Sequence, residues 1–507
     1  MRFILAGLTA ILFAPQDPPK PAAPPPPREM KISLKQCVHM ALANGLDIEI
    51  ARYQPWIDDQ GVLLSLGTFD HIAYASLNAG NSRTASTNAF GGAAIVDVDT
   101  YSTRLGLRRT LPLGLTSDLY FQVSKYDTNS AFATIDPQWT DTLGLTLTLP
   151  LLKGRGEDAT YSGVVVARET RRISQLNFEK TLGDQVLAVH QAYWDLVFAI
   201  EQKKLKDQSL QVADKLLDET KKKFDRGLLA KVDVTEAESG VAGQKEGIIT
   251  AENAVQTAAD KLKRLIDPSL LRTDVVLVPL DTPLPPTTQT DEKAAVAKAL
   301  EDALSLRADY RLIANQLAIQ DANLRKAQND RLPKLDLTAN GNLNGTDDSL
   351  GGARSEFLDL RTRDWSLGIV LEWPLEGRSA AGALQKAELE RRRLWLQRQN
   401  LEDTMLLEAR EAVRSVRSAE QRIEATRKAA DLAQEQLDGE FNRREQGLRT
   451  TFHVLDADKR RTEARTNAVK ALIDYQLAVQ QVHRVSGTLL GRNDVLIEDQ
   501  LAPRMRR

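Results

Sequence analysis

Few residues in this chain have types and spacings that could support catalysis. The one cysteine is Cys37, so neither a disulfide framework nor a cysteine-rich metal site is available. The chain also lacks a glycine-rich phosphate loop, a nucleophile elbow and a His-Glu-x-x-His motif. We therefore expect no catalytic residue, no metal and no cofactor, and we do not expect an enzyme. The histidines are scattered and nowhere show metal-ligand spacing: His39, His71, His190, His453 and His483.

Composition indicates a long helical protein instead. The 507 residues are too many for one ordinary compact core, and aromatic residues make up only 5% of them, which is ordinary for long helical bundles. The 67 basic and 69 acidic residues nearly balance. A general nucleic-acid-binding protein normally carries a basic excess, so we expect no nucleic-acid partner.

One motif occurs twice. Residues 227–237 and 447–457 read GLLAKVDVTEA and GLRTTFHVLDA, and they align without a gap at a separation of 220 residues. Both begin with Gly-Leu and place an apolar residue at Val232 or Phe452. A repeat this large indicates a duplicated structural unit, so we expect a fold of two related halves.

Long helical segments flank both motifs. No proline occurs between residues 158 and 226, which is enough for a helix of about 100 Å at 1.5 Å per residue. A return helix is expected over 232–266, and the second half repeats the pair over 380–446 and 452–485, with Gly487 as the stop.

A heptad pattern of apolar residues follows the first long helix, as in a coiled coil. A shorter helix opens each half, around residues 41–48 and 303–310. We expect the heptad seam to be buried. Its members are Leu182, Val186, Val189, Tyr193, Leu196 and Ile200, continued at sevens by Leu210, Leu217 and Phe224.

Other segments alternate apolar and polar residues with period two, which is typical of strands with one apolar and one wet face. A soluble sheet is one interpretation of this pattern, and a sheet facing lipid is the other. Trp365 and Trp373 end one such segment, as in an aromatic girdle. The predicted strands are 143–149, 335–343 and 365–373, a weaker one at 69–79, and a hairpin at 102–111 and 115–126 that only the first half contains.

The N-terminus resembles an export signal. Arg2 precedes an apolar run that ends at Ala14 and is too short to span a bilayer, and Pro15 leaves the cleavage site undefined. An ordinary hydrophobic N-terminus is the alternative. The predicted organisation is a signal-like segment at 1–14, a proline-rich linker at 15–30, a first repeat at 31–266, a linker at 267–290, a second repeat at 291–490 and a tail at 491–507.

Several segments, in order and in both halves, resemble the TolC-like outer-membrane efflux protein family over nearly the whole chain past residue 31. The two Gly-Leu turns resemble the family's periplasmic tips. The opening helix and the strand joints carry the rest of the resemblance: Ile32–Gln36 before Ala41–Asn44, Leu149–Gly154, Leu332–Leu335 and Trp373–Arg378.

The resemblance implies an α+β fold, in which a trimeric outer-membrane β-barrel is continued by a long periplasmic α-helical barrel. Each chain of the homotrimer would supply four strands to a twelve-stranded barrel in outer-membrane lipid. The additional hairpin departs from that pattern and would either enlarge the barrel or decorate its mouth.

The implied function is a passive exit duct of a tripartite efflux pump or a type I secretion system. Its partners would be a periplasmic adaptor protein and an inner-membrane transporter. The sequence identifies neither the cargo nor these partners. The alternative is a periplasmic coiled-coil scaffold without a pore.

The resemblance also implies roles for single residues. Asp456 would line a cation-selective entrance, and the nearby histidine would add positive charge only when protonated. The alternative to these roles is that the glycines only form turns, the charged residues are solvated on the surface, and the histidine packs in a helix interface. The residues are Gly227, Leu228, Gly447 and Leu448 at the adaptor-docking tips, Asp233, Arg449 and Arg444 (which replaces a family tyrosine) at the gate, and His453 and Asp456 at the entrance ring.

Overall fold

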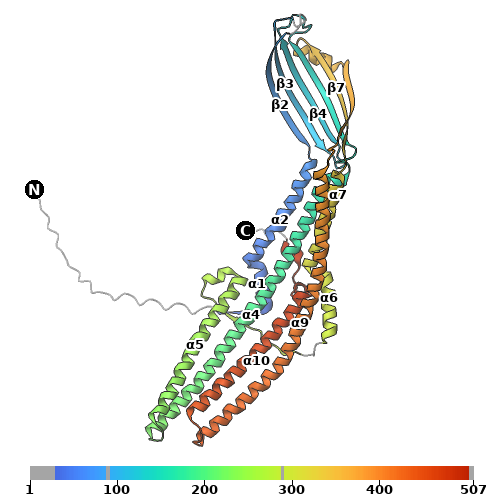
Figure 1. Ribbon diagram of the computed structural model, residues 1–507. Helices are drawn as coiled ribbons and strands as arrows, with labels where there is room; N and C mark the ends of the chain where they lie inside the picture. The colour runs from blue at the N-terminus through green and yellow to red at the C-terminus, as the bar shows by residue number, and fades with distance from the viewer. Residues whose placement is uncertain (1–28, 87–91, 287–290, 502–507) are drawn as a thin grey trace, which may run out of the picture.

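Helices and one sheet occupy opposite ends of an elongated molecule (Figure 1). The computed structural model describes residues 29–86, 92–286 and 291–501. The signal-like segment 1–14 and most of the proline-rich segment 15–30 lie outside the described residues.

Four long helices form the two predicted hairpins. α4 (Ser162–Asp225) and α9 (Arg378–Glu445) run away from the sheet, and α5 (Lys231–Ile266) and α10 (Thr451–Val485) return beside them (Figure 1). The 64 residues of α4 span about 96 Å at 1.5 Å per residue. The prediction of two long helical hairpins is confirmed. None of the described helices is both long and apolar enough to cross a membrane.

The heptad seam of α4 is buried in its first part only. Leu182, Val186, Val189, Tyr193 and Leu196 are at most 1% exposed. The predicted continuation at sevens is wrong, because Phe224 is 40% exposed and the buried stripe has moved by one residue. This stripe contacts α10, because the hydroxyls of Ser209 and Thr220 lie 2.7 and 3.4 Å from those of Thr462 and Thr451. Its members are Leu205, Ser209, Ala213, Leu216 and Thr220.

Each half opens with two helices rather than the one short helix predicted. In the first half α1 (Leu34–Asn44) and α2 (Leu46–Leu66) meet at Gly45. In the second half α6 (Glu292–Leu306) and α7 (Ala308–Asp330) meet at Arg307. Both joint residues have extended backbones, with φ −65°, ψ 120° and φ −64°, ψ 126°. α2 packs along α4, and α7 along α4 and α9.

The sheet contains six antiparallel strands in the order β2-β3-β4-β5-β7-β8. Four strands per chain is the number that the family resemblance implied, and the extra hairpin, whose place was left open, brings it to six. The extra hairpin β3–β4 pairs along its length with β2 on one side and β5 on the other, so it widens the sheet. Within the described chain, β2 and β8 each pair on one side only. The strands are β2 (Ile72–Ala85), β3 (Ile95–Thr110), β4 (Thr116–Thr128), β5 (Gln138–Pro150), β7 (Lys334–Asp347) and β8 (Thr362–Glu372).

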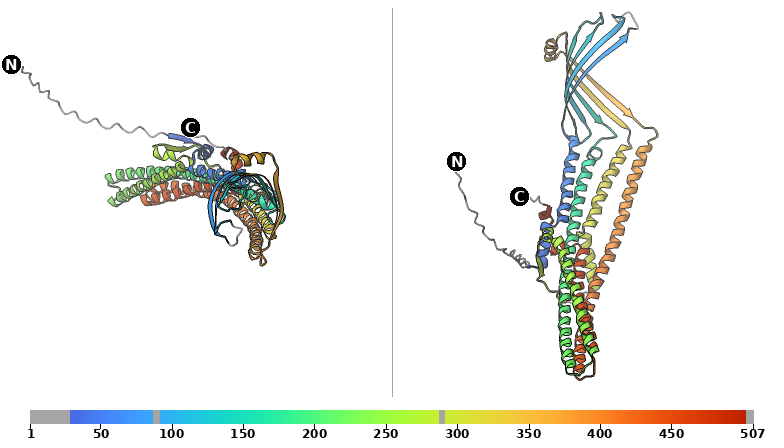
Figure 2. Two further views of the ribbon diagram at one scale, coloured as in Figure 1. Left: turned by 90° about the horizontal axis from the view of Figure 1, so that it is seen from above. Right: turned by 90° about the vertical axis from the view of Figure 1, so that its left-hand side faces the viewer.

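The register gives the sheet one apolar and one polar face. A row across the apolar face joins Leu105, Phe121, Leu143 and Leu343. The neighbouring row, on the opposite face, joins Arg104, Gln122, Thr142 and Asn344. Figure 2 shows that the strands curve together. The predicted alternation of strand faces is thus confirmed.

Between sheet and helical tips lies a waist where distant parts of the chain meet. β1 (Glu29–Ile32) pairs in parallel with β6 (Val276–Pro279). The segment 267–290, predicted as a linker, contains β6 and a 3-10 helix, η3 (Pro268–Arg272). The main core includes residues from β1, α1, α4, α5, β6, α10 and α11 (Leu489–Arg492). The shorter elements are η1 (Gly67–Phe69), α3 (Glu157–Thr160), α8 (Leu350–Leu358) and α12 (Ile497–Leu501).

Candidate functional site

The two helical tips share one backbone geometry. Gly227 and Gly447 have φ of 76° and 77°, a left-handed conformation that glycine adopts without strain. The N–H of Leu228 donates to the Lys223 carbonyl at 2.9 Å, and the N–H of Leu448 donates to the Arg443 carbonyl at the same distance. Each glycine N–H closes the shorter bond of the same Schellman-type turn.

This turn leaves a leucine exposed at each tip. In a Schellman turn, the residue after the glycine usually packs against an apolar side chain on the last helical turn. Here that position holds Lys223 in one tip and Arg443 in the other, so Leu228 and Leu448 remain 69% and 70% exposed. The glycines are explained by the turn, whereas the leucines are not.

A second apolar residue, for which no role was predicted, is exposed at each tip. Val232 and Phe452 occupy the same position in the two repeats and are 71% and 57% exposed. The aligned motifs already contained this signal, because both copies place an apolar residue there. Each tip therefore presents a pair of apolar side chains.

Arg444 ties the two hairpins together behind the tips. It is only 6% exposed and lies on α9, yet its Nη1 donates to Glu219 on α4 at 2.7 Å and its Nη2 to Thr220 at 3.2 Å. The Thr220 hydroxyl also lies 3.4 Å from that of Thr451 on α10. Glu219 was not predicted, because it lies 225 residues from Arg444 in the sequence.

The other two predicted gate residues do not meet in the described chain. Asp233 accepts a hydrogen bond from the Ala230 N–H at 3.0 Å, which satisfies a free donor at the start of α5. Arg449 lies 3.6 Å from the carboxylate of Glu440 on α9. An ion pair between Asp233 and Arg449 is absent from the part of the chain that the structure describes.

The predicted entrance residues lie one helical turn apart at the start of α10. The Nδ1 of His453 is 3.1 Å from the Thr450 hydroxyl, and its ring meets that of Phe452 edge-on. Asp456 forms an ion pair with Arg460 at 2.7 Å. Arg460 was not predicted, and it offsets part of the negative charge expected of Asp456.

Further buried polar groups line the contact between α4 and α10. Ser209 on α4 and Thr462 on α10 are both buried, and their hydroxyl oxygens are 2.7 Å apart. Asp458 and Arg461, both on α10, approach within 2.7 Å and are also buried. Burial raises the pKa of Asp458 despite the nearby charge of Arg461, and burial lowers the pKa of Arg461. The contact between the hairpins is therefore partly polar.

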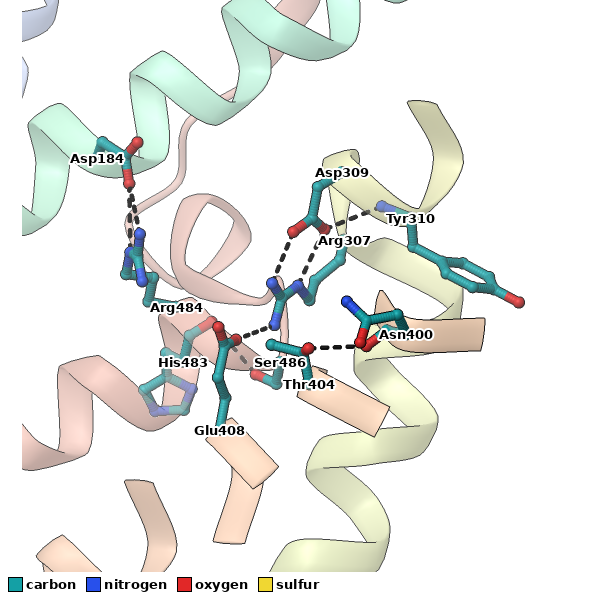
Figure 3. Close-up of polar contacts among 10 residues, drawn as sticks. All are labelled: Asp184, Arg307, Asp309, Tyr310, Asn400, Thr404, Glu408, His483, Arg484 and Ser486. Carbon is teal, nitrogen blue, oxygen red and sulfur yellow. Dashed lines mark hydrogen bonds and ion pairs between the residues drawn. The ribbon is translucent and has the colours of Figure 1, made fainter. Parts of the chain in front are cut away.

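A charged cluster holds the bend at the waist (Figure 3). Arg307, at the α6–α7 joint, pairs with Asp309 at 2.6 Å and reaches Glu408 on α9 at 2.5 Å. Burial opposes ionisation of Asp309, but the hydrogen bond and charge of Arg307 outweigh it and hold the pKa of Asp309 below its ordinary value. Arg484 on α10 pairs with Asp184 on α4 at 3.0 Å. These pairs fix α6, α7, α9, α10 and α4 relative to one another.

No grouping of three or more His, Cys, Asp or Glu side chains among the described residues could hold a metal ion. The candidate functional regions are thus the two tips, the ties behind them and the two-faced sheet.

Comparison with known proteins gives a consistent result for both repeats. The sequence profile described as "Outer membrane efflux protein" matches residues 108–266 and 299–488. "Outer membrane protein TolC" of Vibrio cholerae serotype O1 is 25% identical over 343 residues, which cover 65% of this chain and 74% of that protein. The protein of the same name from Escherichia coli K12 is 22% identical over 337 residues, which cover 65% of this chain and 66% of that protein.

Solved structures agree on the fold. The outer-membrane channel OprN superposes with a TM-score of 0.67 at 16% identity, covering 90% of both chains. The Campylobacter jejuni CmeC outer membrane channel superposes with a TM-score of 0.66 at 14% identity, covering 92% of this chain and 89% of that one.

Proposed function

The chain belongs to the outer membrane efflux protein family, and from that premise we propose that three copies form a passive outer-membrane exit duct. The duct would take cargo from an inner-membrane transporter through a periplasmic adaptor. It supplies no energy itself.

The two-faced sheet is the observation that supports this proposal best. Its apolar face suits lipid, and its polar face suits a water-filled lumen. Because β2 and β8 each pair on one side only within the described chain, the sheet needs other strands to satisfy its edges in a membrane. Six strands from each of three chains would close an eighteen-stranded barrel.

The long helices extend the duct away from the membrane. Three copies of the α4–α5 and α9–α10 hairpins would line a periplasmic channel, with the paired tips at its far end. Two exposed apolar residues at each tip suit an adaptor that covers both repeats at once. The ties from Arg444 to Glu219 and Thr220 would hold the hairpins in a closed arrangement.

A periplasmic scaffold without a pore is the rival function. A scaffold has no need for a sheet with opposite apolar and polar faces, which favours the duct. Cell fractionation separates the two, since the duct is expected in outer membranes and the scaffold in the soluble periplasmic fraction.

The purified full chain provides the second part of that test. We expect a detergent-stable particle of three 56.2 kDa chains that conducts ions across a planar bilayer. A particle with the mass of one chain, or an insulating trimer, would contradict the duct.

A further inference from the structure

A short helix, α8 (Leu350–Leu358), lies on the face of the sheet that should contact lipid. It connects β7 to β8 at the end of the sheet far from the long helices (Figure 2). It packs on β7 and β5. Its partners there are Asp141, Phe121 and Gly345, which share the apolar face with Leu143.

The sheet is shaped to receive this helix. A Cβ atom on Gly345 would lie 2.1 Å from the carbonyl oxygen of Ala353 and 2.3 Å from the Phe357 nitrogen, so only glycine permits this approach. The rings of Phe357 and Phe121 meet edge-on with centroids 5.8 Å apart. The helix is therefore a packed part of the fold.

A charged residue under α8 explains why the helix must stay in place. Asp141 lies on the apolar face and is 0% exposed. Arg354 of α8 donates its Nε–H to Asp141 Oδ2 at 2.6 Å, with its guanidinium 5.5 Å from the centre of the Phe121 ring. Without α8 this carboxylate would face hydrocarbon, which is costly for a charged group.

Leucines in α8 and just after it are left uncovered by the described part of the chain. Leu350, Leu358 and Leu360 are 43%, 68% and 57% exposed. Leu360 also has a φ of 54°, a left-handed conformation that is strained for leucine and ordinary for glycine or asparagine. Leucine at this position points to a use for its side chain outside the chain itself.

Arg361 and Arg363 separate these leucines from the exposed apolar residues of β8, and Arg363 lies on the same face of the sheet as its partner Leu343. Beginning five residues after Leu360, that face carries Trp365, Leu367 and Ile369, which are 80%, 64% and 66% exposed. Leucines and arginines therefore lie together at this level of the sheet. Such a mixture suits the boundary between hydrocarbon and headgroups, where an arginine can extend its charge toward water.

We propose that α8 is a membrane-interface anchor, with Leu358 and Leu360 inserted into the hydrocarbon edge of the outer leaflet. The ion pair between Arg354 and Asp141 holds the helix against the barrel, and the leucines fix how deeply the barrel sits. This inference rests on the proposed function, because it requires the sheet to lie in a bilayer.

Single-cysteine labelling tests the proposal. The natural thiol of Cys37 is fully buried and burial raises its pKa to about 12, so it will not react with an environment-sensitive fluorophore in the folded chain. Leu358→Cys and Leu360→Cys report on α8. Thr362→Cys, on the polar face two residues later, is the matched control. Leu367→Cys, in the middle of the apolar face of β8, reports whether the sheet is in the bilayer.

In phosphatidylcholine vesicles, labels at 358 and 360 should be quenched by spin-labelled acyl chains and protected from iodide. The label at 362 should show the reverse. Iodide quenching at 358 and 360 with lipid quenching at 367 would overturn the anchor but leave the duct intact. Protection from both quenchers at 358 and 360 would mean that a neighbouring chain covers the leucines, and would also overturn the anchor. Iodide quenching at 367 would refute the membrane placement of the sheet itself.

Discussion

At the scale of single residues, the tips show which side chains the fold explains and which it leaves for a partner. Gly227 and Gly447 are required by a left-handed backbone. Leu228 and Leu448 make no packing contact that the turn requires, and each remains about 70% exposed. Covering apolar surface gains about 25 cal/mol per Å², so a protein that covers both leucines would gain binding free energy that this chain does not use in folding.

Arg444→Ser is expected to loosen the two hairpins and raise the single-channel conductance in planar bilayers. The substitution removes the bonds to Glu219 and Thr220. Because the Glu219 side chain is 56% exposed, each chain should lose about 1 kcal/mol of the interaction free energy between its two hairpins. This value is nearer to that of a surface ion pair than to that of a buried one. Arg443→Ser is the matched control, since Arg443 pairs with Glu440 on its own helix. Equal conductance in both variants and the wild type would remove Arg444 from the gate.

The entrance ring should respond to charge changes on α10. Arg460→Gln frees the Asp456 carboxylate from its ion pair and is expected to increase cation selectivity. His453→Asp should increase it further, because a second carboxylate would then lie one helical turn from Asp456. Reversal potentials across a salt gradient measure the selectivity. The same reversal potential in wild type and in both variants would show that this turn of α10 does not line the entrance.

His190 should make the stability of the waist depend on pH. It is 3% exposed, its Nε2 lies 3.2 Å from Asn493 Oδ1, and burial lowers its pKa below the ordinary 6.5. The folded chain therefore binds fewer protons than the unfolded chain just below pH 6.5. The contribution of neutral, buried His190 to the free energy of unfolding is therefore complete above that pH. It decreases as the pH falls, by up to about 1.4 kcal/mol per pH unit.

His190→Gln should remove that acid-dependent loss in denaturant unfolding measured above and below pH 6.5. His39→Gln, on the exposed side of α1, is the control and should keep it. A pH dependence that is unchanged in His190→Gln would assign the effect to other groups, such as His483, whose pKa burial also lowers.

At the scale of elements, the two tips should act together. Leu228→Asp combined with Leu448→Asp is expected to abolish efflux while the trimer still inserts into the outer membrane, because both leucines are exposed and contribute little to folding. The measurement is substrate sensitivity of cells together with detergent-stable trimer yield. Gln446→Asp adds charge to one tip without removing a leucine and should leave efflux near normal. Normal efflux in the double variant would exclude the leucines from docking.

The elements also show what a sequence predicts well. The ends of α4, α5, α9 and α10 were placed within a few residues, because these long proline-free segments end at a Gly-Leu turn, at Asp267 before a proline, or at Gly487. The joints at Gly45 and Arg307 were missed because the helical pattern continues on both sides of each one.

Most contacts between distant segments could not be predicted from the sequence. β1 and β6 have four residues each, too few for a period to appear, and they pair across more than 240 residues. Two ion pairs join charges that lie far apart in the chain: Arg444 with Glu219, and Arg354 with Asp141. The sequence shows which residues are charged, but the packing of distant segments decides which of them form ion pairs.

At the scale of the whole molecule, the extra hairpin sets the width of the proposed duct. Barrel diameter grows roughly in proportion to strand number. An eighteen-stranded barrel should therefore be about one and a half times as wide as the twelve-stranded barrel that the family resemblance implied. The hairpin lies between β2 and β5, with a partner strand on each side, so it contributes to the wall along its full length.

Removing the hairpin should narrow the barrel without opening it. Replacing residues 85–137 by a two-residue turn joins β2 to β5 as antiparallel neighbours, with Ala75 opposite Leu147 and both on the apolar face. Four strands would then remain in each chain, and the barrel diameter seen by electron microscopy should fall to about two thirds. The tips are untouched, so adaptor binding should persist and serves as the control for folding. A barrel of unchanged diameter would mean that β3 and β4 leave the barrel wall in the trimer. If no trimer forms while the isolated chain keeps its helices, the hairpin is needed to close the barrel rather than to widen it.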